Sequence, residues 1–300
     1  MRAAFARTLA ELADQDDRIL LLTGDLGFMA LEPFADRHPD RFFNVGVAEQ
    51  NMVGLATGLA EAGFLPFVYS IATFASLRGY EFIRNGPVAH RLPVRVVGVG
   101  GGFEYGSAGL THHALEDVGV MRLQPGLLVL APADHEQATT TIRATWDHPS
   151  PIYYRLGKDD RTVVPGLDGR FALGRVELVR KGRNRVLVAM GSITATVVEA
   201  AETLDAAVLL VSTLNPPPTV ALATHLARFS RVVTVEAHYL VGGLGSLVAE
   251  TVAEAGLQCR VTRLGVTGLP DGRSGTASYH LDRHGLSRDG IVRRARAAFE

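Results

Sequence analysis

The first 160 residues alternate short apolar runs with longer stretches in which apolar residues recur at helical spacing. This spacing predicts an amphipathic helix over residues 1–16, and small residues predict a long helix from about Ala48 to Ala62. Short apolar runs predict strands at 19–22, 67–70, 94–99 and 127–131, and a strand or loop at 42–47. Such alternation of strands and helices is typical of a mostly parallel sheet that is covered on both faces.

The pattern fades between residues 158 and 184, where Gly, Arg and Asp accumulate, and a second α/β unit begins at Arg185. The 300 residues fit two domains of about 150 residues each. We therefore predict an α/β protein with domains at 1–160 and 185–300, joined by a linker at 161–184. The second domain is predicted to have strands at 185–190, 207–211 and 231–235 and helices at 194–204 and 247–255.

The composition narrows the class of protein. Lys plus Arg number 30 and Asp plus Glu 31, so the formal net charge is −1 and the basic excess of a nucleic-acid binder is missing. No apolar run approaches the roughly 18 residues of a membrane span, and the acidic, helix-forming start is unlike a signal peptide. The single cysteine, Cys259, leaves no intramolecular disulfide and no CxxC metal site. We expect a cytoplasmic protein that binds neither nucleic acid nor membrane.

Two glycine-rich turns follow predicted strands, at Gly98–Gly102 and Gly242–Gly245. Such turns either let backbones pack closely or bind a phosphate, and by the rules for turns we rank close packing first. The chain has no P-loop, no GxSxG motif and no metal-ligand cluster of convincing spacing.

One carboxylate, Glu49, lies between an apolar loop and an apolar helix of small residues. It could simply be an acid in the first helical turn, where it faces the positive end of the helix dipole. The apolar neighbours Val47 and Met52 instead suggest a poorly solvated site. A carboxyl group shielded in this way suits proton transfer to a bound heterocycle.

A second candidate segment, Thr111–Asp117, concentrates four titratable groups after a glycine-rich loop. Glu116 and Asp117 fit the first turn of a solvated helix, which composition favours slightly. The alternative is a catalytic cluster that includes His112 and His113.

Five segments, taken in order, resemble the transketolase family of thiamine-diphosphate enzymes. The resemblance covers nearly the whole chain and matches that family's pyrimidine-binding and C-terminal domains, but not its diphosphate-binding domain. It is specific for the superfamily and not for one substrate. The segments are Asn44–Met52, Thr73–Glu81, Thr111-His112, Tyr154–Gly157 and Glu236–Ser246.

The resemblance implies roles on the cofactor side of a site. Glu49 matches the glutamate that shares a proton with N1′ of the aminopyrimidine and so promotes ionisation at C2 of the thiazolium. Phe74 matches the aromatic residue that stacks on the pyrimidine, although its pattern alone fits a core Phe equally well. Asp25 matches a loop acid near the cofactor, and Ile71 stands where the family has a second aromatic residue.

On the substrate side, the resemblance implies that His112 hydrogen-bonds the hydroxyl or oxyanion of the donor. Arg2 and Arg155 match arginines that hold a sugar phosphate, and Arg78 matches an arginine of the related deoxyxylulose-phosphate synthases.

Three positions depart from the family on this side. Ala108 replaces the acid that reads a ketose hydroxyl, Gly100 replaces a phosphate-contacting histidine, and Met29 replaces a serine. The cofactor side is therefore expected to be intact and the substrate side rebuilt, which puts ordinary pentose-phosphate recycling in doubt.

The family holds Mg²⁺ and the diphosphate with a Gly-Asp-Gly motif followed further along by Asn. The nearest match, Gly24-Asp25-Leu26-Gly27, lacks the second glycine in register. The resemblance therefore implies a split enzyme in which an N-terminal-type partner subunit supplies the diphosphate and Mg²⁺ ligands, assembled as an α2β2 heterotetramer. The C-terminal domain is then expected to serve in packing and dimer contacts.

Three hypotheses of function remain open. The first is a transketolase-like transferase that moves a two-carbon ketol unit, or a related acyl unit, from a phosphorylated ketose-type donor to an acceptor. The second is the β-type subunit of a 2-oxo-acid dehydrogenase or of a decarboxylase similar to deoxyxylulose-phosphate synthase, which Ala108 suits better. The third is a catalytically silent subunit that only stabilises its partner. In the first two, the substrate is a small molecule.

Overall fold

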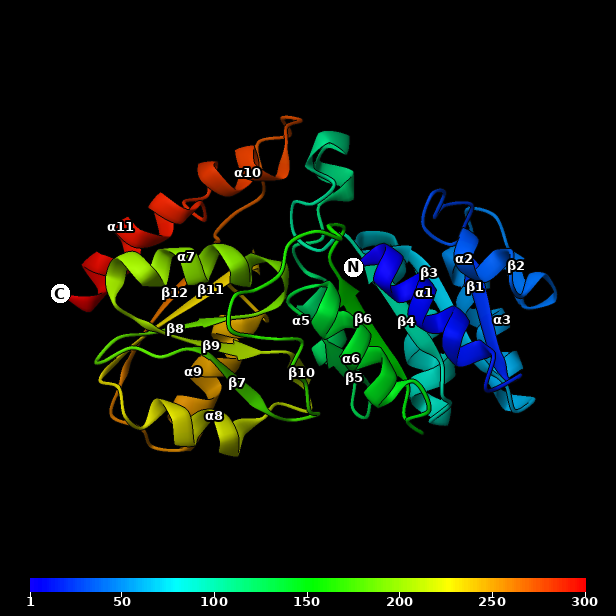
Figure 1. Cartoon of the computed structure of the whole chain (residues 1–300), viewed down its shortest axis with the longest axis horizontal. Helices are drawn as coiled ribbons and strands as arrows, with labels where there is room; N and C mark the ends of the chain where they lie inside the picture. Colours follow the sequence, from blue (N-terminus) through cyan, green and yellow to red (C-terminus); the bar gives the residue numbers. More distant parts are fainter.

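The computed structural model describes residues 1–300 and contains two β-sheets side by side, each flanked by helices (Figure 1). The N-terminus lies near the middle of the molecule, where the two halves meet, and the C-terminus lies at the far end of the second half. The predicted α/β class with two domains is confirmed. None of the helices is both long and apolar enough to cross a bilayer.

The first sheet is parallel except at one edge. Its order is β10-β5-β6-β4-β3-β1-β2, and only β10 runs antiparallel to its neighbour. Alternate residues along each strand face opposite sides, so Leu21 and Tyr69 join one apolar cluster while Leu22 and Val68 join another. The strands are β1 (Ile19–Thr23), β2 (Phe42–Asn44), β3 (Leu65–Ile71), β4 (Arg95–Val99), β5 (Leu128–Leu130), β6 (Ile152–Leu156) and β10 (Thr213–Asn215).

Helices cover both faces of this sheet. Helices α1 (Arg2–Ala13) and α6 (His135–Thr145) contribute to the cluster on one face, and α3 (Glu49–Glu61) and α5 (Asp117–Arg122) to that on the other. The shorter helical segments are α2 (Glu32–Ala35), η1 (Pro39–Arg41), η2 (Phe74–Arg78), α4 (Tyr80–Ile83), η3 (Arg84–Val88), η4 (Gly106–Ala108) and η5 (Leu110–His112); η2 and η3 are π-helical.

The second sheet has the order β12-β11-β8-β9-β7, and only β7 is antiparallel to its neighbour. In Figure 1, α7 and α11 lie above it and α8 and α9 below. Its strands are β7 (Val176–Arg180), β8 (Val186–Ala189), β9 (Ala207–Val211), β11 (Arg231–Tyr239) and β12 (Arg260–Val266). Its helical segments are η6 (Gly191–Ile193), α7 (Thr194–Leu204), α8 (Thr219–Leu226), α9 (Leu244–Glu254), α10 (Ala277–Arg283) and α11 (Arg288–Phe299).

Two strands lie where the hydrophobic pattern did not place them. Strand β7 lies inside the interval 161–184, which was expected to be linker. The hydrophobic pattern does not indicate this strand, because Glu177 interrupts its apolar residues and it lies at the edge of the sheet. Strand β10 follows the second-sheet strand β9 but pairs with β5 of the first sheet. One apolar cluster also continues through both halves, from Val118 and Met121 of α5 to Leu244 of α9. The two halves therefore pack as a single body.

Candidate active site

The candidate residues come from segments that follow the carboxyl ends of the strands in the first sheet. Asp25 follows β1, Glu49 follows β2, Phe74 and Arg78 follow β3, and His112 follows β4. In parallel α/β sheets this edge is where ligands bind. The topology therefore collects residues that are far apart in the sequence.

Glu49 is buried, with 1% of its surface exposed, and both of its carboxylate oxygens are bonded. Ser70 Oγ donates a hydrogen bond to Oε1 at 2.9 Å, and Arg78 Nη1 donates to Oε2 at 2.6 Å. Gly24 lets the preceding loop approach, because a Cβ there would lie 3.3 Å from the Gly46 carbonyl oxygen and 3.7 Å from Glu49 Oε1. This buried carboxylate is therefore compensated by side chains, one of them the 35% exposed Arg78.

Arg78 connects this carboxylate to Phe74 and, through Phe74, to His112. The Arg78 guanidinium carbon lies 4.4 Å from the centre of the Phe74 ring, and the His112 ring meets Phe74 edge-on with centroids 5.0 Å apart. Thr111 Oγ1 is 3.0 Å from His112 Nδ1, which leaves Nε2 free for another partner. Phe74 and Arg78 stand at the two ends of a π-helical turn, a geometry that recurs at functional sites.

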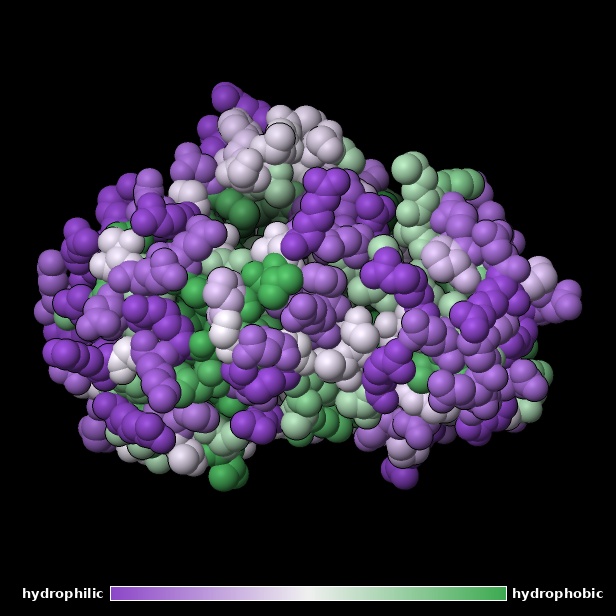
Figure 2. Space-filling view, in the orientation of Figure 1, coloured by the Kyte–Doolittle hydropathy of each residue, from purple (hydrophilic) through white to green (hydrophobic).

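The loop around Asp25 is exposed and bears apolar side chains. Asp25 has a φ of 57° and is held by Asn44, whose Oδ1 accepts the Asp25 N–H at 2.9 Å and whose Nδ2 donates to Asp25 Oδ1 at 3.0 Å. Phe28 and Met29 are 76% and 95% exposed. On the face shown in Figure 2, light-green atoms stand out in this region, beside α2, among mostly hydrophilic purple ones. Ile71 is half-buried at the end of β3.

Two side chains that the sequence analysis did not single out extend this group. The Tyr105 ring lies against the backbone of Gly100, where a Cβ would be 2.2 Å from ring carbons, and its centroid is 6.5 Å from that of His112. Lys158 Nζ lies 4.6 Å from the centre of the Tyr105 ring, and Arg2 Nε donates a 3.4 Å bond to the Lys158 carbonyl. The missing side chain at Gly100 was the one sequence signal of this arrangement.

We call the series Glu49, Arg78, Phe74, His112, Tyr105 and Lys158 the site row. Each of its members contacts or adjoins the next. Its order follows the order of the strands that precede these residues, from β2 through β3 and β4 to β6.

Arg155 is not brought to the site row. It is 4% exposed, and its Nε donates to Asp117 Oδ2 at 2.8 Å while Nη2 donates to the carbonyls of Ala114 and Ala237, both at 3.0 Å. Burial alone would lower the pKa of Arg155, but the Asp117 carboxylate outweighs it and raises the pKa above the ordinary value. Arg155 thereby ties the segment after His112 to strand β11 of the second sheet.

The segment Thr111–Asp117 is divided between two surroundings. His112 is half-buried beside Phe74, whereas His113 is buried and its ring lies 4.7 Å from that of His280 in α10. Asp117 is fully buried and also accepts a 2.8 Å bond from the Tyr153 hydroxyl. The segment is therefore neither a solvated helix start nor one compact cluster.

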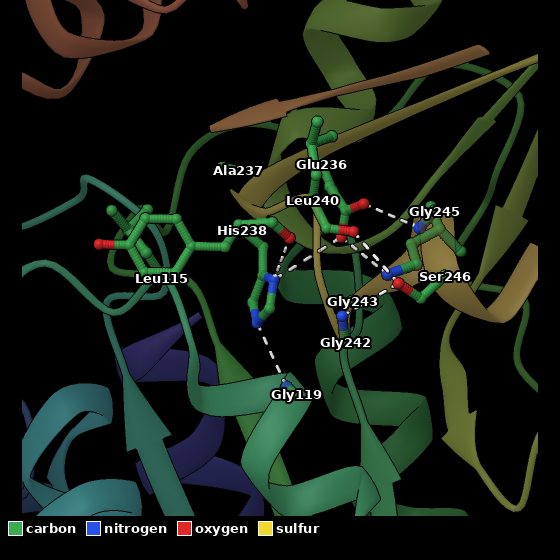
Figure 3. A network of polar contacts seen from close by, with 12 residues as sticks. Leu115, Gly119, Glu236, Ala237, His238, Leu240, Gly242, Gly243, Gly245 and Ser246 are labelled. Atoms are coloured by element: carbon green, nitrogen blue, oxygen red, sulfur yellow. Dashed lines mark hydrogen bonds and ion pairs between the residues drawn. The ribbon is translucent and has the colours of Figure 1, made fainter. Parts of the chain in front are cut away.

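A second buried polar group connects the two halves (Figure 3). Glu236 accepts the N–H groups of Leu244 and Gly245, at 2.7 and 2.8 Å, and burial raises its pKa to about 7. His238 Nε2 accepts the Gly119 N–H at 3.2 Å, and burial lowers the pKa of His238 to about 4. We call Asp117, Arg155, Glu236 and His238 the domain joint.

Both glycine-rich turns serve close packing. A Cβ at Gly98 would lie 2.5 Å from the Tyr153 hydroxyl, and one at Gly101 would lie 2.5 Å from the guanidinium carbon of Arg155. At Gly243 it would lie 2.0 Å from Glu236 Oε2. The interpretation of these turns as close-packed backbone, which was ranked first, agrees with these contacts.

A cavity of about 600 Å³ lies between the two halves and does not include Glu49, Phe74 or His112. It adjoins the site row at Lys158 and is also lined by Arg2 and Glu104. Glu104 accepts hydrogen bonds from the Ser192 hydroxyl and the Lys158 N–H, and burial raises its pKa. Of the site row, only Lys158 thus lines this cavity. No group of three or more His, Cys, Asp or Glu side chains is placed to hold a metal ion.

Both halves of the chain match known protein domains. Residues 1–162 match the transketolase pyrimidine binding domain and residues 174–291 the transketolase C-terminal domain. The chain is 33% identical to a subunit of the apulose-4-phosphate transketolase of Phocaeicola vulgatus, over 98% of this chain and 96% of that one. It is 34% identical to a 6-deoxy-6-sulfo-D-fructose transketolase subunit of Clostridium sp., over 100% and 94%. A solved split gene transketolase, described as an inactive β4 tetramer, superimposes with a TM-score of 0.87 at 33% identity, covering 99% of this chain and 97% of that one.

Proposed function

The chain belongs to the transketolase family as a C-terminal-type subunit of a split enzyme, and from this premise we propose that it transfers a two-carbon ketol unit, or a related acyl unit. The donor is a ketose-type, phosphorylated small molecule, and the cofactor is thiamine diphosphate. The observation that carries this proposal is the buried Glu49 carboxylate, which Arg78 connects to the Phe74 ring, with His112 next in the site row.

These residues fit the pyrimidine end of thiamine diphosphate. Glu49 offers a water-shielded carboxylate whose Oε2 is held by the 35% exposed Arg78 side chain. Phe74 offers an aromatic face that Arg78 connects to this carboxylate, and Gly24, next to Asp25, lies close to Glu49. Ile71 ends the strand that precedes Phe74. Thiamine diphosphate supplies the nucleophilic carbon and the electron sink that no side chain of the chain can provide.

Side chains of this chain have three further roles in the proposed reaction. Glu49 would hold and return a proton at the pyrimidine nitrogen of the bound cofactor. His112 is held at Nδ1 by Thr111, so its Nε2 can hydrogen-bond a hydroxyl or oxyanion of the substrate. Phe74 orients the heterocycle by stacking, which is worth on the order of 1 kcal/mol beyond burial.

The partner in this proposal is an N-terminal-type subunit that brings the diphosphate-binding domain and the ligands of Mg²⁺. The exposed Phe28, Met29 and Val47 border the Asp25 loop and the start of α3, and exposed apolar side chains of this kind mark a docking face. The relatives named as subunits of split transketolases support such a partner. We propose an α2β2 assembly in the cytoplasm.

One observation keeps a second candidate open. Ala108 is exposed in η4, shortly before His112, and it offers no oxygen to a ketose hydroxyl. A 2-oxo-acid donor needs no such acceptor, as in the β-type subunits of 2-oxo-acid dehydrogenases and in decarboxylases related to deoxyxylulose-phosphate synthase.

The test is to purify the chain together with an N-terminal-type transketolase subunit and to titrate the complex with thiamine diphosphate and Mg²⁺ by calorimetry. We expect saturable heat, followed by turnover with xylulose 5-phosphate or fructose 6-phosphate as donor. Turnover with pyruvate and not with the sugar phosphates would select the decarboxylating alternative. No heat and no turnover would instead leave a silent, partner-stabilising subunit.

A further inference from the structure

His112 lies on a loop whose two ends are bonded to each other. The Gly102 N–H donates to the Ala114 carbonyl at 2.8 Å, and the Ala114 N–H donates to the Gly102 carbonyl at 2.9 Å. We call residues 102–114 the site loop. The position of His112 depends on the contacts that the rest of this loop makes.

Consecutive residues of the site loop meet different halves of the chain. His112 meets the Phe74 ring of the first half, with ring centres 5.0 Å apart. The next residue, His113, is 3% exposed, and its ring centre lies 4.7 Å from that of His280 in α10 of the second half. A shift of His113 therefore shifts His112 as well.

Helix α10 also lies against the turn that precedes His112 (Figure 1). A Cβ at Gly106 would lie 2.7 Å from His280 Cδ2 and 2.8 Å from the Gly275 carbonyl oxygen. The Gly275 N–H donates to the Gly106 carbonyl at 3.3 Å. Gly106 begins η4, which ends at Ala108. The second half of the chain thus contacts the site loop at two points.

The side chains at this contact surround one phenyl ring. Phe103 is 1% exposed, and the rings of His280 and His284 lie nearly parallel to it, with centres 5.2 and 5.1 Å away. The His113 ring meets Phe103 edge-on at 5.0 Å, and the Tyr279 ring meets His280 edge-on at 5.2 Å. We call Phe103, His113, His280 and His284 the histidine cluster.

The imidazoles of the histidine cluster lack a carboxylate partner. Both ring nitrogens of His113 and Nε2 of His280 are buried without a hydrogen-bond partner. Burial lowers the pKa of His113, and the neighbouring imidazoles of His280 and His284 lower it further. A proton added here is a buried charge without compensation, so the packed cluster is neutral.

The charged groups on the side of α10 do not supply that compensation. Burial lowers the pKa of His284, and His280 and Arg283 add to this effect, whereas Asp271 opposes it. Asp271 Oδ2 accepts a 2.6 Å bond from Arg283 Nη2, so the carboxylate is already paired. Arg294 of α11 donates to the His284 carbonyl at 3.0 Å and adds a further cation.

The site loop offers no free acid to the cluster either. The Glu104 carboxylate accepts from the Ser192 hydroxyl and the Lys158 N–H, and His112 disfavours a proton on His113. The closed loop therefore disfavours protons that an open loop would bind near the ordinary histidine pKa of about 6.5. Closure is complete above that pH and weakens as the pH falls below it.

We infer that His280, in the second half of the chain, is a positioning residue for His112. Its neutral ring packs on Phe103 and His113 and so holds the site loop in place, and acid opens the loop. The inference rests on the proposed function, because it takes His112 as the residue that meets the substrate. It gives the second half a role beyond the packing and dimer contacts expected of it.

The test compares His280→Ala, which leaves a space beside Phe103, with His280→Leu, which fills that space with a side chain that does not titrate. His225→Ala and His225→Leu are matched controls, because His225 is a half-buried histidine of α8 beside β7 and β9. All variants are prepared as the complex of chain and partner. Hydrogen–deuterium exchange reports closure of the site loop, and the melting temperature reports the fold.

His280→Ala is expected to raise exchange in the site loop about tenfold, and His280→Leu to keep it within about threefold of wild type. From about pH 7.5 to 5.5, wild-type exchange, corrected for its intrinsic pH dependence, should rise; it should rise less in His280→Leu, which has one titrating ring fewer. Both His225 variants should match wild type.

Turnover shows whether His280 acts through His112. With the donor that the wild type uses, His280→Ala is expected to lower kcat about tenfold, and His280→Leu to restore it to within about threefold of wild type. In a His112→Ala background, His280→Ala should have no further effect, because the residue that it positions is absent.

The inference is overturned if His280→Ala and His225→Ala give the same exchange in the site loop, or if His280→Ala lowers kcat equally with and without His112. A lower melting temperature with faster exchange throughout the chain would show a general structural role and overturn it too. Failure of the proposed function is distinguishable, because it appears as absence of thiamine-diphosphate heat in the wild-type complex. In that case exchange in the site loop still decides whether His280 holds it.

Discussion

The site row and the domain joint each contain a buried glutamate, but the two carboxylates are held in different ways. Glu49 in the site row is bonded by a serine hydroxyl and an arginine, both of which are side chains. Glu236 in the domain joint is bonded by two backbone N–H groups at the start of α9. Side chains can exchange partners when a ligand arrives, whereas the backbone of a packed helix cannot. Burial alone therefore does not mark a reactive carboxylate; the kind of partner does.

The largest effect that tests this comparison is expected at Arg155. The family resemblance assigns Arg155 to the substrate site, whereas its contacts place it in the domain joint. Arg155→Met would leave Asp117 buried with only the Tyr153 hydroxyl as partner, and its Oδ1 already lacks one. We expect the free energy of unfolding in urea to fall by about 3–5 kcal/mol.

Arg155→Lys is the matched control, since lysine keeps the charge but cannot reach all three acceptors, and it should lose less. If Arg155→Met leaves the unfolding free energy unchanged and raises KM for a charged acceptor instead, Arg155 belongs to the site row and the comparison fails.

The two titratable groups of the domain joint should give opposite pH dependences. The pKa of His238 is lowered to about 4, so between pH 4 and 6.5 the unfolded chain binds a proton that the folded chain does not, and stability rises with pH. The pKa of Glu236 is raised to about 7, so from pH 4.5 to 7 the folded chain holds a proton that the unfolded chain has released, and stability falls with pH. Across most of this window the two contributions cancel in the wild type.

Single variants separate the contributions of His238 and Glu236 to the pH dependence of stability. Relative to wild type, the unfolding free energy of His238→Gln should fall by about 3 kcal/mol from pH 4 to 6.5, and that of Glu236→Gln should rise by a similar amount from pH 4.5 to 7. The measurement is urea unfolding at half-unit steps of pH. Difference curves that stay flat would mean that water reaches the joint and that both groups titrate normally.

Much of the fold could be predicted from the sequence because the strands of both sheets are short apolar runs that end in loops. Strand β10 could not, since its antiparallel pairing with β5 depends on how the two halves pack. In the site, Glu49, Phe74 and His112 stand in local motifs whose order in the chain matches a family. Which way Arg155 points could not be predicted, because both faces of β6 are buried.

Tyr105 and Lys158 escaped the sequence analysis for a related reason. The Tyr105 ring fills the space left by Gly100, and Lys158 lies against that ring. The glycine is visible in the sequence, but it does not show which side chain fills the space. The assignments of Asp25, Ile71 and Arg2 stay predictions, because their functions depend on groups that a partner subunit, the cofactor or the substrate would supply.

The most direct test compares Glu49→Gln with Glu236→Gln in the same complex of chain and partner. We predict that Glu49→Gln lowers kcat at least 100-fold at an unchanged melting temperature, because glutamine cannot transfer the proton. Glu236→Gln should keep kcat within a few-fold of wild type and lose about 1–3 kcal/mol of stability, because an amide group then faces a backbone N–H. Full activity in Glu49→Gln, or a loss of activity confined to Glu236→Gln, would contradict the assignment of Glu49 as the proton-handling carboxylate.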